Sequence, residues 1–225
     1  LYSRFFMRAI NYKNNKFKIT EPFEGLFTQG MVCHETYKDE NNNWLSPDEV
    51  ESKDGKKFFI KKYPDKKVFV GSSESMSKSK KNTIDPEDII NNFGADAVRL
   101  FILSDSPPEK DVQWSEQGMV ASYKFMQKLW TLHQKFKDKI KEDSKGENNE
   151  IEIFTNQMIK KINYNLEKFH YNVIVANLYE AYNFFTQKLN LNRSNKNLSD
   201  SYTKFLTVIS PINSTILLRK CLEEF

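Results

Sequence analysis

The stretch "VGSSESMSKSKKNTIDPEDI", Val70–Ile89, joins a polar segment rich in serine and lysine directly to a strong helix start. Its first part contains few side chains suited to burial, so its composition predicts an exposed loop. Its second part places Asp85 before Pro86, and these residue types favour the N-cap and the first helical position. The sequence therefore predicts a mobile loop that ends at a well-defined helix.

The helix after Asp85 carries Ile89, Ile90 and Phe93 on one face, and Gly94 is a typical stop. The next segment, "ADAVRLFILS", predicts a second short, buried helix. "DSPPEKDVQW" follows as a break marked by two prolines. We expect a domain boundary at its end, after residue 114.

Before the loop, the sequence predicts the end of a helix over Leu1–Ile10 and a further helix in "ITEPFEGLF", where Thr20 would be the N-cap. "MVCHETY" predicts a strand over Met31–Tyr37. The polar segment beyond it contains turn signals and two short strand candidates, "KFFIKK" and "KVFV". These indicate a small β-rich insertion at about 38–70.

From Ser115 onward apolar residues recur at three- and four-residue spacing, which predicts amphipathic helices in an antiparallel bundle. The polar segments "EDSKGENN" and "NLNRSNKNLS" would separate these helices, and a last segment would begin at Tyr202. Three stripes are expected in the core: Met119, Tyr123, Met126, Trp130 and His133; Phe154, Met158, Ile162, Leu166 and Phe169; Ile174, Leu178, Ala181, Phe185 and Leu189.

The composition favours a protein of the reducing cytosol. The 225 residues are 39% hydrophobic and carry a net charge of +4, which by itself does not identify a polyanionic partner. Cys33 and Cys221 lie far apart, and with three histidines they do not indicate a metal site. No apolar run approaches the roughly 20 residues of a membrane span, and no signal peptide is expected.

The loop has a plain interpretation and a chemical one. It is either a solvated surface loop, with serines open to phosphorylation, or a phosphate-binding element in which small residues admit phosphate oxygens and Lys78 adds a mobile charge. Two unit charges about 4 Å apart interact by roughly 4 kcal/mol at an effective dielectric near 20. The spacing of a P-loop is absent.

The segment "SMSKSKKNTIDPEDIINNFGADAVRLFILSDSPPEKDVQWS" resembles the Lys-Met-Ser-Lys-Ser signature of class I aminoacyl-tRNA synthetases and its downstream helices. "PFEGLFTQGMVCHETYKDENNNWLSPDEVE" and "SPPEKDVQWS" are similar to the leucyl-tRNA synthetases within that class. The resemblance implies an α/β plus all-α fold. Residues 1–114 would be the C-terminal part of a Rossmann-type catalytic domain, with the insertion at 38–70 and the signature loop at 71–82. Residues 115–225 would be an incomplete helical anticodon-binding domain.

The implied reaction activates leucine with ATP, accompanied by Mg²⁺, and transfers it to leucine tRNA. The implied enzyme is cytoplasmic and monomeric at full length. Lys78 would stabilise the ATP phosphates and the departing pyrophosphate, and it would act as the catalytic residue. The other implied ATP contacts are Ser75, Met76, Ser77 and Ser79 in the loop, and Gly30, Met31 and Val32 at the strand start. The implied tRNA contacts are Lys124, Lys128, Lys160, Lys161 and Lys168.

Three departures from the family pattern matter. Ser75 stands where the signature has its first lysine, and we expect reduced dependence on that position. The chain contains no His-x-Gly-His, the other half of the ATP site, so we expect a fragment that is inactive alone. The segment 211–225 loses the expected pattern of the last helix. The alternatives are a fragment of another branched-chain synthetase and a non-catalytic RNA-binding module.

Overall fold

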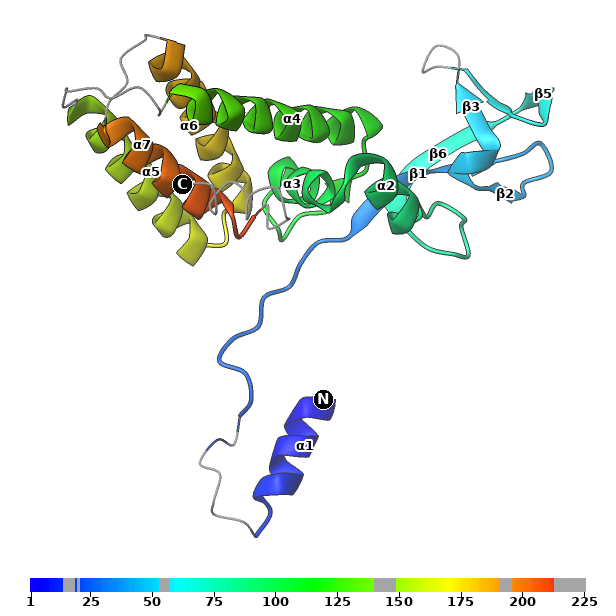
Figure 1. Ribbon diagram of the computed structural model, residues 1–225. Helices are drawn as coiled ribbons and strands as arrows, with labels where there is room; N and C mark the ends of the chain where they lie inside the picture. The colour runs from blue at the N-terminus through cyan, green and yellow to red at the C-terminus, as the bar shows by residue number, and fades with distance from the viewer. Residues whose placement is uncertain (14–18, 20, 53–56, 140–148, 191–195, 213–225) are drawn as a thin grey trace.

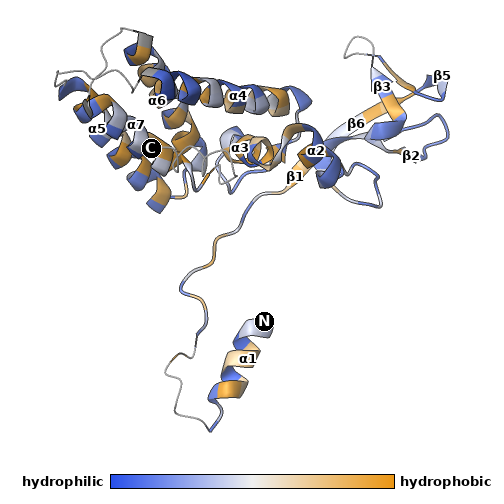
Figure 2. Cartoon of the chain, in the orientation of Figure 1, coloured by the Kyte–Doolittle hydropathy of each residue, from blue (hydrophilic) through white to orange (hydrophobic). Residues whose placement is uncertain are grey.

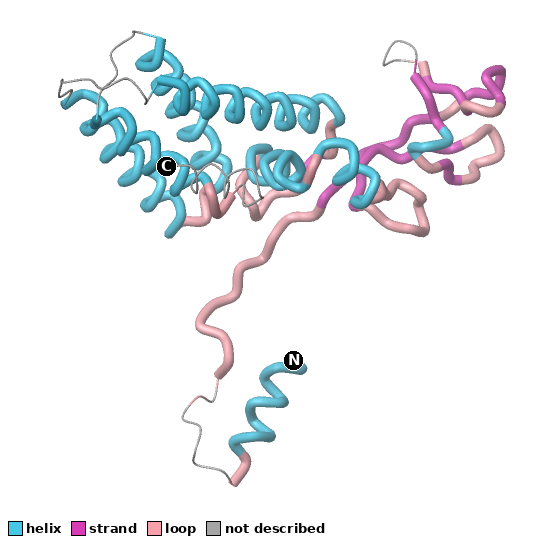
Figure 3. The backbone as a smooth tube through the Cα atoms, viewed as in Figure 1, coloured by secondary structure: helices cyan, strands magenta, loops and turns pink. Residues whose placement is uncertain are grey.

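The computed structural model describes residues 1–13, 19, 21–52, 57–139, 149–190 and 196–212. Strands gather at one end of the main body and helices at the other, with the loop and two short helices between them (Figures 1 and 3). A separate helix, α1 (Tyr2–Asn11), lies away from this body, and the extended segment of residues 21–31, called the arm below, leads from its side of the molecule to strand β1 (Val32–Lys38) (Figure 1). The predicted combination of an α/β part and an all-helical part is observed at this coarse level.

The central sheet has four strands: β1 (Val32–Lys38), β2 (Trp44–Leu45), β6 (Phe69–Ser75) and β7 (Val112–Gln113). Strand β1 confirms the predicted strand and pairs antiparallel with β2 and β6. It also pairs parallel with β7, which lies inside the proline-marked break. That segment is therefore attached to the start of β1 rather than being a free linker.

The insertion forms a second sheet of three antiparallel strands beyond the end of the β1–β6 ribbon, as Figure 1 shows. The predicted strand in "KFFIKK" corresponds to β4 (Phe58–Ile60), and "KVFV" spans the end of β5 (Tyr63–Lys67) and the start of β6. A small cluster of Tyr37, Leu45 and Val50 packs where the ribbon meets this sheet. Its strands are β3 (Val50–Ser52), β4 (Phe58–Ile60) and β5 (Tyr63–Lys67), and the 3-10 turn η1 (Pro47–Glu49) precedes β3.

The two short helices confirm the predicted boundaries. Helix α2 (Pro86–Phe93) begins after Asp85, whose side chain accepts a hydrogen bond from the backbone N–H of Glu87 at 2.9 Å. Gly94 ends the helix at a φ of 81°, a conformation that favours glycine. Helix α3 (Ala95–Asp105) follows at once and is partly buried: Leu100 belongs to the core of the C-terminal helices, and Ala97 and Phe101 belong to a second cluster.

The helices of the C-terminal half share one hydrophobic core, and Figure 2 shows hydrophobic residues, in orange, recurring along these helices. The stacked rings of Phe136 and Tyr202, whose centroids lie 3.8 Å apart, are part of it. Helices α5 (Asn149–Glu167) and α6 (Tyr171–Asn190) are joined by a short turn and pack against each other, and α7 (Lys196–Ile209) packs on both. The four helices are α4 (Glu116–Lys139), α5 (Asn149–Glu167), α6 (Tyr171–Asn190) and α7 (Lys196–Ile209).

The stripe predicted for α6 is confirmed, because all its members are buried. Two other stripes were partly wrong. Leu166 and Phe169 are 51% and 44% exposed, because α5 ends there and Phe169 lies in the turn with a φ of 58°. In α4, Tyr123, Met126 and Trp130 are only partly buried. The core positions that the prediction missed are Phe125, Leu129, Leu132 and Phe136.

Helix α7 begins before the predicted last segment, so part of the expected polar loop is helical. Its C-terminal end is joined to α3 by Arg99, which donates from Nε to the carbonyl oxygen of Ile212 at 3.0 Å and from Nη2 to that of Pro211 at 2.8 Å. A cation is favoured at this end of a helix, where carbonyl groups lack intrahelical partners. Most of the divergent segment 211–225 lies outside the described residues.

The helix predicted in "ITEPFEGLF" was wrong. Thr20 lies outside the described residues, but the segment from Glu21 to Phe27 contains no helix. Phe23 and Leu26 are 50% and 93% exposed, so no core packs against them. Short helices are marginal in water without such packing, and an extended arm results.

None of the helices in the described ranges is long and apolar enough to cross a membrane. Within the same ranges no group of three or more histidine, cysteine, aspartate or glutamate side chains is placed to hold a metal ion.

Candidate functional site

The serine- and lysine-rich loop is shorter than predicted. Gly71–Ser75 belong to β6, so the irregular segment begins at Met76 and reaches Asp85. This part of the strand was missed because nearly all of β6 is exposed, so its sequence shows no alternation of apolar and polar residues. Ser75, the expected lysine position, is therefore the last residue of a strand and pairs with Cys33.

The turn itself is held by serine hydroxyls and the backbone. The hydroxyl of Ser77 accepts from the backbone N–H of Lys80 at 3.4 Å and lies 3.3 Å from the hydroxyl of Ser79. The N–H of Lys81 donates to the carbonyl of Lys78 at 3.3 Å, and Lys81 takes a φ of 53° to close the turn. Lys78 is exposed at the outside of this turn. Its ammonium group can therefore meet an anion without leaving a buried site.

Lys80 differs from Lys78 because its ammonium group forms an ion pair with the carboxylate of Glu74 on β6. The hydrogen bond from Lys80 holds the pKa of the Glu74 carboxyl below its usual value, and a hydrogen bond from the Ser72 hydroxyl adds to this effect. In this conformation Lys80 is therefore attached to the strand rather than directed at a ligand.

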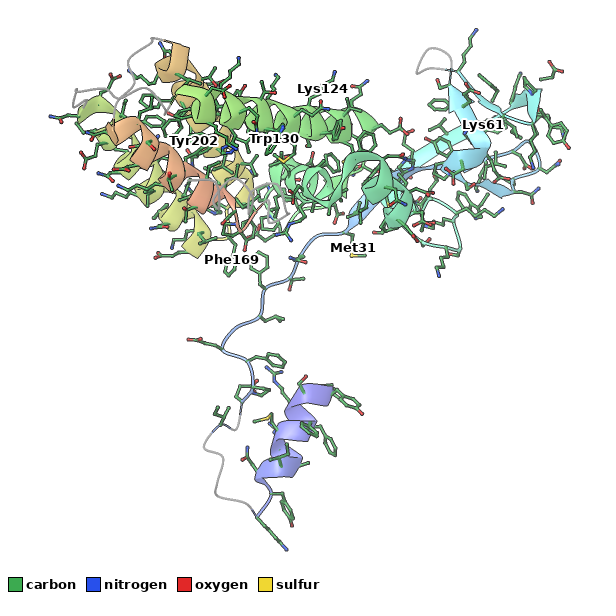
Figure 4. All side chains as sticks on the ribbon, in the orientation of Figure 1. Met31, Lys61, Lys124, Trp130, Phe169 and Tyr202 are labelled. Carbon is green, nitrogen blue, oxygen red and sulfur yellow. The ribbon has the colours of Figure 1, made fainter. Side chains whose placement is uncertain are left out.

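The two expected ATP-binding segments lie side by side. The backbone N–H of Met76 donates to the carbonyl of Val32 at 3.0 Å, which attaches the loop to the start of β1. Met31 is 56% exposed beside this junction, where Figure 4 shows it on the arm. A backbone hydrogen bond thus joins residues that are 44 positions apart in the sequence.

Gly30 is required where it is. A Cβ atom there would lie 2.0 Å from the carbonyl oxygen and 2.2 Å from the carbonyl carbon of Lys110. The close approach allows the N–H of Gly30 to donate to the carbonyl of Pro108 at 2.9 Å. The N–H of Met31 donates to Oδ1 of Asp111 at 2.8 Å. The arm and the proline-marked segment therefore fix the beginning of β1 together.

Asn82 was not among the residues predicted for the site. Its side chain is fully buried, and its Oδ1 accepts from the N–H of Ser77 at 2.8 Å. Its Nδ2 donates to the carbonyls of Glu74 at 3.0 Å and His34 at 3.2 Å. An asparagine in a run of polar residues is usually exposed, so composition gave no signal for this burial.

The five expected tRNA contacts are exposed but lie on separate elements. Lys124 and Lys128 are on α4, and Figure 4 shows Lys124 pointing away from the core. Lys160 and Lys161 are on α5, and Lys161 pairs with Glu180 of α6 at 3.6 Å. Lys168 lies in the turn after α5. These positions are compatible with phosphate contacts and equally with solvated helix faces.

Comparison with known protein families identifies the class of protein to which the loop region is similar. The family described as "tRNA synthetases class I (I, L, M and V)" matches residues 59–115, which include β6, the loop, α2, α3 and β7. The loop and the helices behind it are thus those of a class I aminoacyl-tRNA synthetase.

The similarity to leucine enzymes covers most of the chain. This chain is 41% identical to the leucine–tRNA ligase of Bartonella tribocorum, over 94% of this chain and 25% of that protein. It is 48% identical to that of Rickettsia canadensis over 81% of this chain and 22% of that protein. The chain therefore belongs to the leucyl-tRNA synthetase family, and it spans about a quarter of the length of the curated relatives that it matches.

A solved structure supports the fold. The chain superposes on the AgnB2 leucyl-tRNA synthetase of Agrobacterium radiobacter K84, which was crystallised in a ternary complex with tRNA and LeuAMS. The TM-score is 0.70 with 21% identity, and the match covers 99% of this chain and 25% of that one.

Proposed function

We propose that this chain acts as part of a leucyl-tRNA synthetase, in which its loop handles the ATP phosphates. The observation that carries the proposal is the junction of the loop with β1, where the backbone N–H of Met76 donates to the carbonyl of Val32, together with the exposure of Lys78 two residues further along the loop. The family membership supplies the chemistry. We also propose that residues 1–114, which include the parallel pair β1–β7, are the C-terminal part of a Rossmann-type catalytic domain.

In the proposed reaction, a carboxylate oxygen of leucine attacks the α-phosphorus of ATP. The bond from that phosphorus to the bridging oxygen breaks, and pyrophosphate leaves with the electron pair. Negative charge grows on the leaving group, so a positive charge that approaches it stabilises the transition state more than the ground state. Lys78 has the exposure for this role, and the hydroxyls of Ser77 and Ser79 hold its turn. Magnesium enters with ATP as part of the substrate.

The second proposed step transfers the leucyl group to the 3′ ribose of leucine tRNA, with release of AMP. Lys124, Lys128, Lys160, Lys161 and Lys168 are the proposed phosphate contacts on the helical part. We also propose a cytoplasmic enzyme that is monomeric at full length. The residues described here contain no His-x-Gly-His, so the proposed ATP site needs that motif from another segment.

The role of Lys78 is tested in the complete synthetase by leucine-dependent ATP–pyrophosphate exchange. Lys78→Ala should lower kcat/KM about 10²- to 10³-fold, which corresponds to roughly 2–4 kcal/mol of transition-state stabilisation. Lys62→Ala, which removes an exposed lysine of the insertion, is the matched control and should leave exchange unchanged. A loss below threefold for Lys78→Ala, relative to this control, would refute the assigned role.

The reading frame upstream of Leu1 distinguishes this proposal from a non-catalytic RNA-binding module. A frame that encodes His-x-Gly-His supports the synthetase. A start codon immediately before Leu1 would leave the ATP site incomplete within one polypeptide, and it would favour the RNA-binding module or an enzyme split over two polypeptides.

A further inference from the structure

Asn82 is the most deeply buried polar side chain of the loop region, at 0% exposure, although the exposed Lys81 directly precedes it. It lies where the loop, β1 and β6 meet. Burying an amide group without hydrogen-bond partners is unfavourable. Such a position therefore persists only when the amide is well satisfied.

The partners of Asn82 come from three directions. Its oxygen accepts from the backbone N–H of Ser77 in the loop. Its nitrogen donates to the carbonyl of Glu74 on β6 and to that of His34 on β1, with a longer contact of 3.5 Å to the carbonyl of Ser75. One side chain thus connects both strands of the ribbon to the residue that precedes Lys78.

We propose that Asn82 is a positioning residue that sets the direction in which Lys78 leaves the ribbon. It is buried beneath the turn and acts through Ser77. Asn82 accepts a hydrogen bond from the N–H of Ser77 and thereby orients Ser77. The hydroxyl of Ser77 in turn accepts from the N–H of Lys80, and this bond shapes the turn that presents Lys78. This inference rests on the proposed function of the loop in ATP activation.

The position also suits a loop that must move. The hydrogen bonds of Asn82 hold the base of the loop on the ribbon, while Lys78 and Ser79 at its outside are exposed. A fixed base and a free tip let the lysine approach and leave the phosphates along one path. The arrangement reduces the number of conformations that the loop samples before Lys78 reaches the phosphates.

Two substitutions separate hydrogen bonding from simple filling of space. Asn82→Ala removes all the bonds and leaves a small void. Asn82→Asp preserves the volume and the acceptor for Ser77, but it places a second oxygen against the carbonyls of Glu74 and His34. If Asn82 only fills space, the aspartate variant behaves like the wild type. If its donor bonds position the loop, both variants are impaired.

The matched control is Asn165→Ala in α5. Asn165 is also a buried asparagine, and its side-chain amide donates to the carbonyl of Lys161 at 2.8 Å. This variant removes a similar bond at a distance from the loop. Thermal unfolding of all three variants shows how much of any effect is a general loss of stability.

The first readout is amide hydrogen exchange at Ser77 in the 225-residue chain, measured by NMR. We expect faster exchange in both Asn82 variants and unchanged exchange in Asn165→Ala. The second readout is ATP–pyrophosphate exchange in the complete synthetase. Both Asn82 variants should lower kcat on the order of 10- to 100-fold, the size of loss that a misplaced catalytic group produces, with the KM for leucine unchanged.

An Asn82→Asp variant that matches the wild type in Ser77 exchange and in kcat would overturn the inference, even if Asn82→Ala fails to fold. So would equal losses of kcat in Asn82→Asp and in the Asn165→Ala control. The Lys78→Ala variant separates the proposed function of the loop from the positioning role of Asn82. A silent Lys78→Ala variant overturns the proposed function and this inference together. An impaired Lys78→Ala beside a silent Asn82→Asp overturns this inference alone.

Discussion

Gly30→Ala should destabilise the junction between the arm, β1 and the proline-marked segment. The added Cβ would lie 2.0 Å from the carbonyl oxygen of Lys110 and 2.6 Å from the backbone nitrogen of Asp111. Both are backbone atoms, so no flexible side chain can move aside. The segment that carries Lys110 must shift away from β1, or the start of β1 must shift instead.

The cost can be worked out from the bonds that such a shift breaks. They are the bond from the N–H of Gly30 to the carbonyl of Pro108, at 2.9 Å, and that from the N–H of Met31 to the carboxylate of Asp111, at 2.8 Å. At about 1 kcal/mol each, they amount to roughly 2 kcal/mol. Remaining in place would cost a similar amount, because overpacking typically costs about 1–3 kcal/mol. Either response therefore lowers the free energy of unfolding by about 2 kcal/mol.

The assay is thermal unfolding of the 225-residue chain, combined with hydrogen exchange at the amide of Val112, which donates to the carbonyl of Met31 at 2.9 Å. For a chain of this size about 2 kcal/mol corresponds to a Tm lower by roughly 4–8 °C. Gly25→Ala is the control, because a Cβ at that position meets nothing within 4 Å. If the two variants have the same Tm and the same Val112 exchange, the inferred close contact is wrong.

Three further outcomes are expected. Arg99→Ala should lower the free energy of unfolding by about 1–2 kcal/mol in a denaturant titration, because two bonds to the end of α7 are lost, and Arg99→Lys should recover less than half of this because an ammonium group lacks the two-pronged geometry. Asp85→Ala should cost about 1 kcal/mol through loss of the α2 N-cap, seen as faster hydrogen exchange at the start of that helix; unchanged exchange would contradict the cap. The hydrogen bond from Lys80 lowers the pKa of the Glu74 carboxyl, so the ion pair stabilises the loop at pH values above the ordinary glutamate pKa, and this stabilisation is lost as the pH falls through the lowered pKa. An NMR titration of Lys80→Ala should show a higher Glu74 pKa than in the wild type. An unchanged pKa would refute the ion pair.

Local chemistry was predictable from the sequence. Asp85, Pro86 and Gly94 set the ends of α2 through hydrogen bonding and backbone conformation, which do not depend on distant contacts. The buried stripe of α6 was predictable for a related reason, since a helix packed over its whole length keeps one regular apolar period.

Features set by distant contacts were not predictable. Strand β6 is almost wholly exposed, so its serines resemble a loop, although its backbone pairs with β1. Asn82 is buried because residues from two strands surround it, and nothing near it in the sequence indicates this. Phe23 and Leu26 look like helix residues but are left without a core to pack against.

The same limits apply to the candidate site. The resemblance to synthetases predicted which segments would contact ATP, and the structure joins them through Met76 and Val32. It did not predict that Lys80 is paired with Glu74, which depends on the side of the ribbon that each residue faces. The roles of these residues in catalysis remain predictions for the experiments above.

The insertion leaves and re-enters the ribbon at one point, because Lys38 on β1 and Phe69 on β6 are direct partners. The thirty residues between them therefore start and finish at neighbouring backbone positions. A two-residue hairpin turn could replace that entire excursion and leave the register of β1 and β6 unaltered. The module is thus separable: a genetic event that adds, exchanges or deletes it can change what the ribbon carries at its far end without rebuilding the loop at its near end.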